Sequence, residues 1–152
     1  MRLALYQPDI PHNTGAILRL AACLSLGVDI IEPCGFLWED KRLRRAGMDY
    51  RELAVVTRHA SWERFLADRP HKGRIVLLST QAAQSHTAFS YESDDTLLMG
   101  RESAGVPQDV FAAADARIII PMAAGARSLN VAMAAAIVAA EALRQMDGFP
   151  AA

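Results

Sequence analysis

The sequence predicts a three-layer α/β fold, in which helices cover both faces of a mainly parallel sheet. Short runs rich in Val, Ile and Leu recur along the 152 residues, and segments with helical periodicity separate them. These runs are continuously apolar rather than alternating, which is typical of parallel strands buried on both faces. Neither an internal repeat nor a low-complexity linker divides the chain, so we expect a single domain over residues 1–152.

The first half of the chain alternates strand and helix. LALY predicts a strand over 3–6, and the apolar stripe after Asn13 predicts a helix over 14–26, capped by Asn13 and ended by Gly27. VDIIE and LAVVT predict strands over 28–32 and 53–57. Ser61 is a favourable N-cap for a helix over 61–68.

The second half continues the alternation. IVLLST, TLLMG and RIII predict strands over 75–80, 96–100 and 117–120. Pro107 suits the first position of a helix over 107–113, and Gly148 suits the end of an alanine-rich helix over 129–146. Alanine fills little core volume, so this last helix is expected to lie close to whatever it packs against.

Composition excludes several classes of protein. Hydrophobic residues make up 52% and charged residues 22%, as in globular rather than disordered chains. The sequence shows no export signal, and the apolar stretch 129–143 is shorter than the roughly 20 residues of a membrane span. Cys23 and Cys34 form no CxxC pair and lie among apolar residues, so we expect reduced, buried thiols in a cytoplasmic protein.

Common cofactor and metal signatures are missing. No GxGxxG follows the first strand, and the sequence has no GxxxxGK[ST] phosphate loop. The four histidines show no HExxH spacing and have no paired cysteines beside them, so we expect no metal. A nucleotide-cofactor oxidoreductase is disfavoured on the same grounds.

Three loops are expected to meet at one edge of the sheet, because ligands collect at the carboxyl ends of parallel strands. They are PHNTGAILR (11–19), LLMGRESAGVP (97–107) and IIIPMAAGARSLN (118–130). Each also has a structural explanation: Asn13 and Gly15 can serve a turn and a cap, Arg19 a solvated helix face, and Glu102 a loop anchor. Their occurrence together favours a site.

These motifs resemble those of the SPOUT superfamily of RNA methyltransferases. The resemblance rests on N-T-G-x-x-x-R, G-R-E-S-A-G-V-P and I-P-M…S-L-N-V, and it covers essentially the whole chain. GFLWEDKRLRRAGMDY (35–50) further resembles the TrmL-like branch, which 2′-O-methylates the wobble nucleotide, cytidine or carboxymethylaminomethyluridine, of leucine tRNAs. The resemblance implies a C-terminal trefoil knot, bound S-adenosylmethionine (SAM), which leaves as S-adenosylhomocysteine, and a homodimer packed through helices.

The resemblance also assigns residues to the cofactor site. Glycine at position 100 would allow backbone to come close, and the Glu102 carboxylate would anchor its loop. The cofactor residues implied are Leu78, Ser79, Thr80, Gly100, Glu102, Ile120, Met122, Ser128, Leu129 and Asn130.

The resemblance gives Arg19 and Asn13 the catalytic roles. A guanidinium has a pKa above about 12 and is a weak base, so we expect Arg19 to hold an RNA phosphate and stabilise alkoxide charge. The phosphate, or a deprotonated minority of Arg19, would take the 2′-hydroxyl proton. Asn13 would orient Arg19 or the ribose.

RNA would be recognised by basic and aromatic side chains together. Phosphates would contact the basic run, and loop bases would stack on an aromatic ring; a solvated basic helix beside core aromatics explains the same residues. The residues are Lys41, Arg42, Arg44, Arg45, Phe36 and Trp38.

Two positions depart from the family pattern, and two alternative functions stay open. Ala132 and Ala140 stand where many relatives carry a polar residue and a tyrosine, so neither can supply a proton relay or a polar dimer contact. One alternative keeps the reaction but moves it to another tRNA position or to rRNA. The other is a knotted dimer that binds RNA without catalysis, which the presence of Asn13, Arg19, Glu102 and Asn130 argues against.

Overall fold

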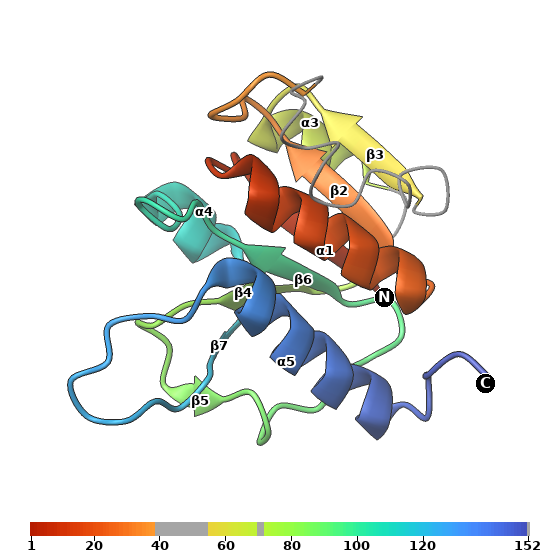
Figure 1. Cartoon of the computed structure of the whole chain (residues 1–152), viewed down its shortest axis with the longest axis vertical. Coiled ribbons are helices and arrows are strands. Elements are labelled where there is room, and N and C mark those ends of the chain that lie inside the picture. Colours follow the sequence, from red (N-terminus) through yellow and green to blue (C-terminus); the bar gives the residue numbers. More distant parts are fainter. Residues whose placement is uncertain (39–54, 70–71, 152) are drawn as a thin grey trace.

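The structure is a computed structural model that describes residues 1–38, 55–69 and 72–151 (Figure 1). In chain order its elements are β1 (Arg2–Tyr6), α1 (Pro11–Cys23), β2 (Gly27–Ile31), β3 (Val56–His59), α3 (Trp62–Asp68), β4 (Ile75–Leu78), β5 (Gln84–Ser85), β6 (Thr96–Met99), α4 (Gln108–Ala113), β7 (Ala116–Ile119) and α5 (Val131–Gln145). The predicted α/β alternation is confirmed.

In the described chain, seven strands form one sheet in the order β3-β2-β1-β6-β4-β7-β5, and every neighbouring pair is parallel. Met99 at the end of β6 is in register with Leu5 of β1 and Leu78 of β4, and Leu78 is in register with Ile118 of β7. The carboxyl ends of these central strands therefore lie side by side, and the loops that leave them meet at one edge.

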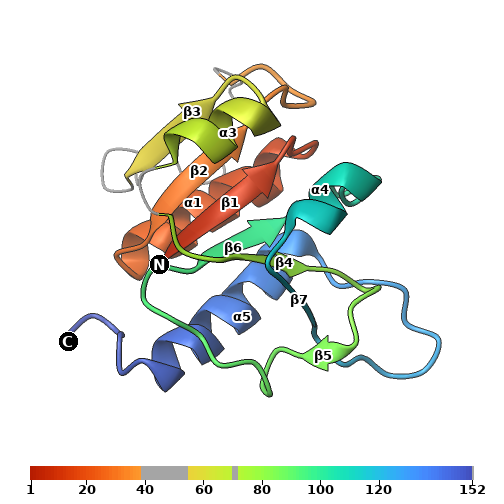
Figure 2. The ribbon, with the colours of Figure 1, turned by 180° about the vertical axis from the view of Figure 1, so that it is seen from behind.

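Helices cover both faces of the sheet. Figure 1 shows α1 and α5 on one face, and the reverse view in Figure 2 shows α3 and α4 on the other. α5 directs Ala135, Ala139 and Ala142 into the core with none of their surface exposed, and it packs beside α1. The expectation of close packing for this alanine-rich helix is confirmed within the single chain.

Several predicted boundaries were wrong by a few residues. α1 begins at Pro11, with Ile10 as its N-cap, so Asn13 lies inside the helix instead of capping it. Proline at the first turn explains the earlier start, because its fixed φ suits a helix and its missing N–H costs nothing there. Ser61 caps α3 as predicted, whereas Pro107 is the N-cap of α4 and not its first residue. The short strand β5 was not predicted.

Neither long helix ends on the glycine that the sequence suggested. Ser25 (φ 55°) and Asp147 (φ 50°) adopt the left-handed conformation just after α1 and α5. The following amides close the motif: Leu26 N–H donates to Ala21 O at 2.8 Å and Gly148 N–H donates to Leu143 O at 2.9 Å. Both ends are Schellman motifs, with a side chain at the position where glycine is usually found.

Replacing these two residues with glycine is therefore expected to stabilise the fold. Ser25→Gly and Asp147→Gly should each raise the free energy of unfolding by about 0.5–1 kcal/mol, because glycine removes the left-handed strain. Asp147→Gly also removes a negative charge from the negative end of α5. Urea unfolding measures the effect. Ser93→Gly, in a surface loop outside the left-handed region, is the matched control, and a loss of stability in both variants would contradict the assignment.

A buried polar network joins the first three strands. Asp29 on β2 has no exposed surface and accepts a hydrogen bond from Arg2 Nε of β1 at 2.6 Å. The ring Nε2 of His59 on β3 lies 2.8 Å from the same carboxylate. A Cβ at Gly27 would lie 2.0 Å from the Arg2 guanidinium, so the absence of a side chain there lets the arginine lie over β2 in this position.

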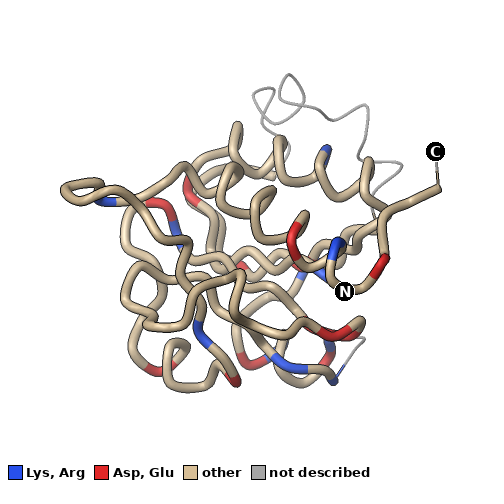
Figure 3. The backbone as a smooth tube through the Cα atoms, turned by 90° about the horizontal axis from the view of Figure 1, so that it is seen from below, with Lys and Arg blue, Asp and Glu red and all other residues tan. Residues whose placement is uncertain are grey.

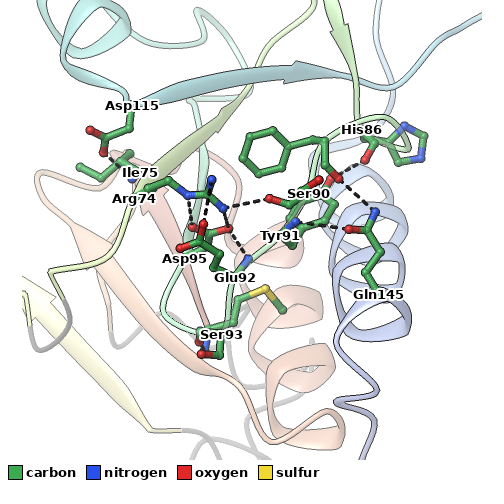
Figure 4. A network of polar contacts seen from close by, with 12 residues as sticks. Arg74, Ile75, His86, Ser90, Tyr91, Glu92, Ser93, Asp95, Asp115 and Gln145 are labelled. Carbon is green, nitrogen blue, oxygen red and sulfur yellow. Dashed lines mark hydrogen bonds and ion pairs between the residues drawn. The ribbon is translucent and has the colours of Figure 1, made fainter.

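A second network fixes the segment between β5 and β6 (Figure 4). Arg74 donates to both carboxylate oxygens of the buried Asp95, at 2.9 and 2.8 Å, and its guanidinium lies 4.9 Å from the centre of the Phe89 ring. Gln145 at the end of α5 bonds the backbone of Phe89 and Tyr91 at 3.0 and 3.3 Å. These contacts hold α5 and the start of β6 together at the edge opposite to the converging loops.

Lys and Arg are interspersed with Asp and Glu around the described backbone (Figure 3). Both cysteines are free, but Cys23 is exposed on α1, so its predicted burial was wrong; Cys34 is half-buried. Among the described residues, every helix is too short or too polar to cross a bilayer.

Candidate active site

The converging loops enclose a cavity of about 540 Å³. Its walls come from the carboxyl ends of β4, β6 and β7, the first turns of α1 and α5, and α4. All ten residues predicted for the cofactor line it, together with Asn13: Leu78, Ser79, Thr80, Gly100, Glu102, Ile120, Met122, Ser128, Leu129 and Asn130. The structure thus brings together residues that lie up to 117 positions apart.

A chain of hydrogen bonds, which we call the relay, joins the three predicted loops. The Asn13 Nδ2 amide donates to Glu102 Oε1 at 3.1 Å, and Asn13 Oδ1 accepts from Asn130 Nδ2 at 2.9 Å. Asn130 Oδ1 in turn accepts from the backbone N–H groups of Ala132 and Met133, at 2.9 and 3.3 Å, and so caps α5.

The relay has a fixed direction. An ionised carboxylate can only accept hydrogen bonds, and the backbone amides at a helix start can only donate. Glu102 and the first turn of α5 therefore determine which way the amides of Asn13 and Asn130 point. Glu102 Oε2 also accepts from the backbone N–H of Asp9 at 2.8 Å, which adds the end of the β1 loop.

The loop after β6 folds back on itself. Arg101 and Gly105 exchange backbone hydrogen bonds of 2.8 Å in both directions, and Gly105 has φ +66°. A Cβ at Gly100 would lie 2.6 Å from the Gly105 carbonyl carbon. The close backbone approach expected at Gly100 is thus confirmed, and it presents Glu102 at the tip of a tight turn.

A clamp around Asp9 supports the same loop. Asp9 Oδ2 accepts from the Ser103 N–H at 3.2 Å and from the Ser103 hydroxyl, and Oδ1 accepts from Arg101 Nη2 at 2.9 Å. Arg101 Nη1 also donates to Gln7 Oε1 at 3.3 Å. The Ser103 hydroxyl, followed by Arg101, lowers the pKa of Asp9 below its ordinary value.

Sequence reasoning missed this clamp. Gln7 and Asp9 directly follow β1, so their position at a strand end was a usable signal, but nothing in the sequence pairs them with Arg101 and Ser103. Several lining residues were missed for the same reason, including Ile10, Leu77, Arg101, Val106 and Phe111.

Asp9→Asn is expected to destabilise the fold by about 1.5–3 kcal/mol at pH 7, since it removes hydrogen bonds to a charged group. The folded-state pKa of Asp9 is lowered, so its contribution is complete above the unfolded pKa, near 4, and is lost as the pH falls through the folded pKa. Urea unfolding should therefore show the difference from wild type shrinking below about pH 4. Asp94→Asn, at an exposed loop position, is the control; a pH-independent difference would contradict this role.

Arg19 lies outside the residues that line the cavity, on the exposed side of α1. The expectation that Asn13 orients Arg19 stays a prediction, but within one chain the side-chain hydrogen bonds of Asn13 lead to Glu102 and Asn130. Helical geometry explains this, because residues six positions apart point about 120° away from each other. Whether Asn13 also contacts the ribose stays a prediction.

The predicted RNA-binding residues divide into two groups. Phe36 and Trp38 follow β2 and are half-buried beside a smaller hollow. Lys41, Arg42, Arg44 and Arg45 lie outside the described residues, so their role stays a prediction from the sequence.

Comparison with known proteins agrees with this geometry. The profile of the SpoU rRNA Methylase family matches residues 1–140. A protein of Beijerinckia indica named tRNA (cytidine(34)-2'-O)-methyltransferase is 57% identical over 145 residues, which cover 95% of this chain and 91% of the relative. The protein of the same name from Escherichia coli K12 is 44% identical and covers 100% of this chain and 97% of its own length.

Solved structures of RNA methyltransferases are also similar to this chain. One, described as giving structural insights into the 2-OH methylation of C/U34 on tRNA, superimposes with a TM-score of 0.90 at 39% identity and covers 97% of this chain and 91% of its own. The SpoU methyltransferase AviRb from Streptomyces viridochromogenes, solved in complex with the cofactor AdoMet, has a TM-score of 0.79 at 26% identity, covering 97% of this chain and 60% of its own.

Proposed function

Since the chain belongs to the SpoU rRNA methylase family, we propose that it transfers the methyl group of SAM to the ribose 2′-oxygen of nucleotide 34, the wobble nucleotide of tRNA. The observation that carries the proposal is the cavity in which the three motif loops are joined by the Glu102–Asn13–Asn130 relay. The substrates we propose are leucine tRNAs with cytidine or carboxymethylaminomethyluridine at that position.

The cavity suits SAM in size and chemistry. Its volume of about 540 Å³ lies within the range of small-molecule sites. Apolar side chains, among them Leu78, Ile120 and Met122, offer a surface for an adenine ring. Polar lining residues come both from the loop after β4 and from the segment before α5. Ser128, Leu129 and Asn130 would hold the methionine part, and Ser79 and Thr80 the adenosine. When bound, the sulfonium supplies an electrophilic methyl group.

The chain's own residues then have to position and activate the 2′-hydroxyl. We assign to the Arg19 guanidinium the binding of the adjacent phosphate and the stabilisation of negative charge that develops on the 2′-oxygen. The phosphate oxygen, or a deprotonated minority of Arg19, accepts the proton. The relay holds the loops in place, so Glu102 and Asn13 are positioning residues, and no metal is needed.

Arg19 does not line the cavity of its own chain, but in a homodimer it could reach the cavity of the partner subunit. Four large apolar side chains are exposed along the start of α1 and the outer side of α5: Ile10 (43%), Leu129 (42%), Met133 (63%) and Ile137 (40%). Large apolar side chains exposed on two neighbouring helices are what a subunit interface would cover. We propose that the outer faces of α1 and α5 form the dimer interface and that Arg19 acts on the partner's cavity.

The remaining parts of the proposal follow the family resemblance. One SPOUT methyltransferase domain would span residues 1–152, with the loops after β6 and β7 contributing to a trefoil knot. The basic run at 41–45 would bind phosphates of the tRNA. Ala132 and Ala140, both half-buried on α5, supply no polar group to the site.

Labelled SAM and total tRNA from a strain lacking this protein provide the test. We expect label in the 2′-O-methylated nucleoside at position 34 of leucine isoacceptors. Label at another tRNA position or in rRNA would contradict nucleotide 34 as the site of methylation. RNA binding without any methyl transfer would identify a non-catalytic RNA-binding protein.

A further inference from the structure

A second hollow, of about 320 Å³, opens at the carboxyl ends of β2 and β3. We call it the Trp38 hollow; Glu32, Trp38 and Arg58 are among the residues that line it. Among the residues that the structure describes, it shares no lining residue with the SAM cavity, but it lies on the same edge of the sheet. The two regions are joined through backbone, since the Gly35 N–H donates to Pro8 O at 2.9 Å.

A stacked cation and ring form one wall of the hollow. The Arg58 guanidinium carbon lies 5.1 Å from the centre of the Trp38 ring. Glu32 Oε1 accepts from Arg58 Nε at 2.8 Å and also from Nη2, and so fixes the guanidinium plane. The Arg58 side chain is 47% exposed and that of Glu32 is 28% exposed, so both reach solvent at the rim.

This chemistry fits an unstacked nucleobase better than a phosphate. Flat indole and guanidinium surfaces are the groups on which single-stranded RNA bases stack. The Glu32 carboxylate beside the cation would repel a phosphate, whereas it can accept a hydrogen bond from the exocyclic amino group of a base. Basic residues able to bind the flanking phosphates begin three positions after Trp38 in the sequence, at Lys41.

We propose that the Trp38 hollow binds one unpaired base of the tRNA that flanks the methylated nucleotide. The inference rests on the proposed function, which puts an anticodon loop at this edge of the sheet. Docking a neighbouring base here fixes the loop while the target ribose reaches the SAM cavity. Trp38, Arg58 and Glu32 are therefore specificity-determining residues that touch RNA and not the cofactor.

The first test uses the wild-type protein and synthetic anticodon stem-loops. Each unpaired nucleotide other than the target is replaced in turn by an abasic residue, and kcat/KM for methylation is measured. We expect one flanking position to lower kcat/KM by about 10- to 100-fold, mainly through KM, because one stacked base is lost. The other positions should have much smaller effects.

The second test combines RNA and protein changes. Trp38→Ala should lower kcat/KM on intact RNA by a similar factor and should cause no further loss on the RNA that lacks the critical base. Trp38→Phe should restore most of the activity, because phenylalanine keeps a stacking surface. Arg64→Ala, at an exposed arginine of α3, is the matched control and should behave as wild type.

Trp38 also packs against the core, so SAM affinity is measured for each variant to confirm folding. If Trp38→Ala does not fold, Arg58→Gln and the abasic series decide instead. Additive losses, or abasic substitutions without effect on an enzyme that methylates intact RNA, would overturn this inference alone. A wild-type protein that methylates no tRNA would overturn the proposed function and this inference with it. Unchanged RNA kinetics in a folded Trp38→Ala protein would likewise overturn this inference.

Discussion

Methyl transfer is expected to fall by about 100- to 1,000-fold in Arg19→Ala, while the affinity for SAM stays within about twofold. Arg19 lies on the exposed side of α1 and does not line the cavity, so its removal leaves the cofactor site intact. What is lost is a cation that stabilises charge developing on the ribose oxygen. Single-turnover transfer measures the first quantity, and calorimetric titration with SAM measures the second.

Mixed dimers determine which cavity Arg19 serves. An Arg19→Ala subunit keeps an intact cavity, and a Glu102→Gln subunit keeps its arginine. If the arginine acts on the partner's cavity, co-expression of the two variants regenerates one complete site in each mixed dimer, or about a quarter of wild-type activity for random pairing. The assay uses SAM well below the Kd of Glu102→Gln. No recovery would place Arg19 on its own cavity, and full activity of Arg19→Ala would remove it from the mechanism.

Glu102→Gln is expected to weaken SAM binding by about 10- to 100-fold, although the two side chains have nearly the same shape. The wild-type carboxylate accepts from both the Asp9 N–H and the Asn13 amide. A glutamine amide would have to turn its NH₂ group toward one of these donors. Turning over the side-chain amides of Asn13 and Asn130 would compensate for this. It would, however, direct the Asn130 NH₂ group at the backbone N–H groups of α5, which now donate to Asn130 Oδ1. One donor therefore faces another in every arrangement.

The control for this change is Glu141→Gln, the same replacement in an ion pair with Arg144 near the C-terminal end of α5, away from the cavity. It should leave SAM affinity and methyl transfer unchanged. Calorimetry with SAM, together with urea unfolding, separates loss of the site from loss of the fold. A Glu102→Gln protein with wild-type affinity would show that the relay does not hold the cofactor loops.

Sequence periodicity was sufficient for most of the fold. The continuous apolar composition of strands such as IVLL predicts that they are buried on both faces. Their alternation with helices predicts that they run parallel. The two residues of β5 are too short for a periodic signal, and they are held by pairing with β7. The ends of α1 and α5 were misjudged because a hydrogen-bonded Schellman motif imposes positive φ on Ser25 and Asp147.

The candidate site was predictable where a motif carried it. The motifs placed Gly100, Glu102 and Asn130 correctly at the cavity, but the partners that hold them were not visible in the sequence. The Asp9 clamp depends on register between β1 and β6, and the Asn13 contacts depend on α1 starting at Pro11. The separation of Arg19 from the cavity is likewise a property of the helix surface, which motif spacing does not report.

One transfer reaction tests the central claim most directly. The protein is incubated with methyl-labelled SAM and two synthetic anticodon stem-loops that differ only in carrying ribose or 2′-deoxyribose at nucleotide 34. We expect label in the ribose-containing RNA and none in the deoxy RNA, and with Arg19→Ala at most about 1% of the wild-type label in the ribose-containing RNA. Equal labelling of both stem-loops by the wild-type protein would contradict transfer to the 2′-oxygen, whatever the cavity binds.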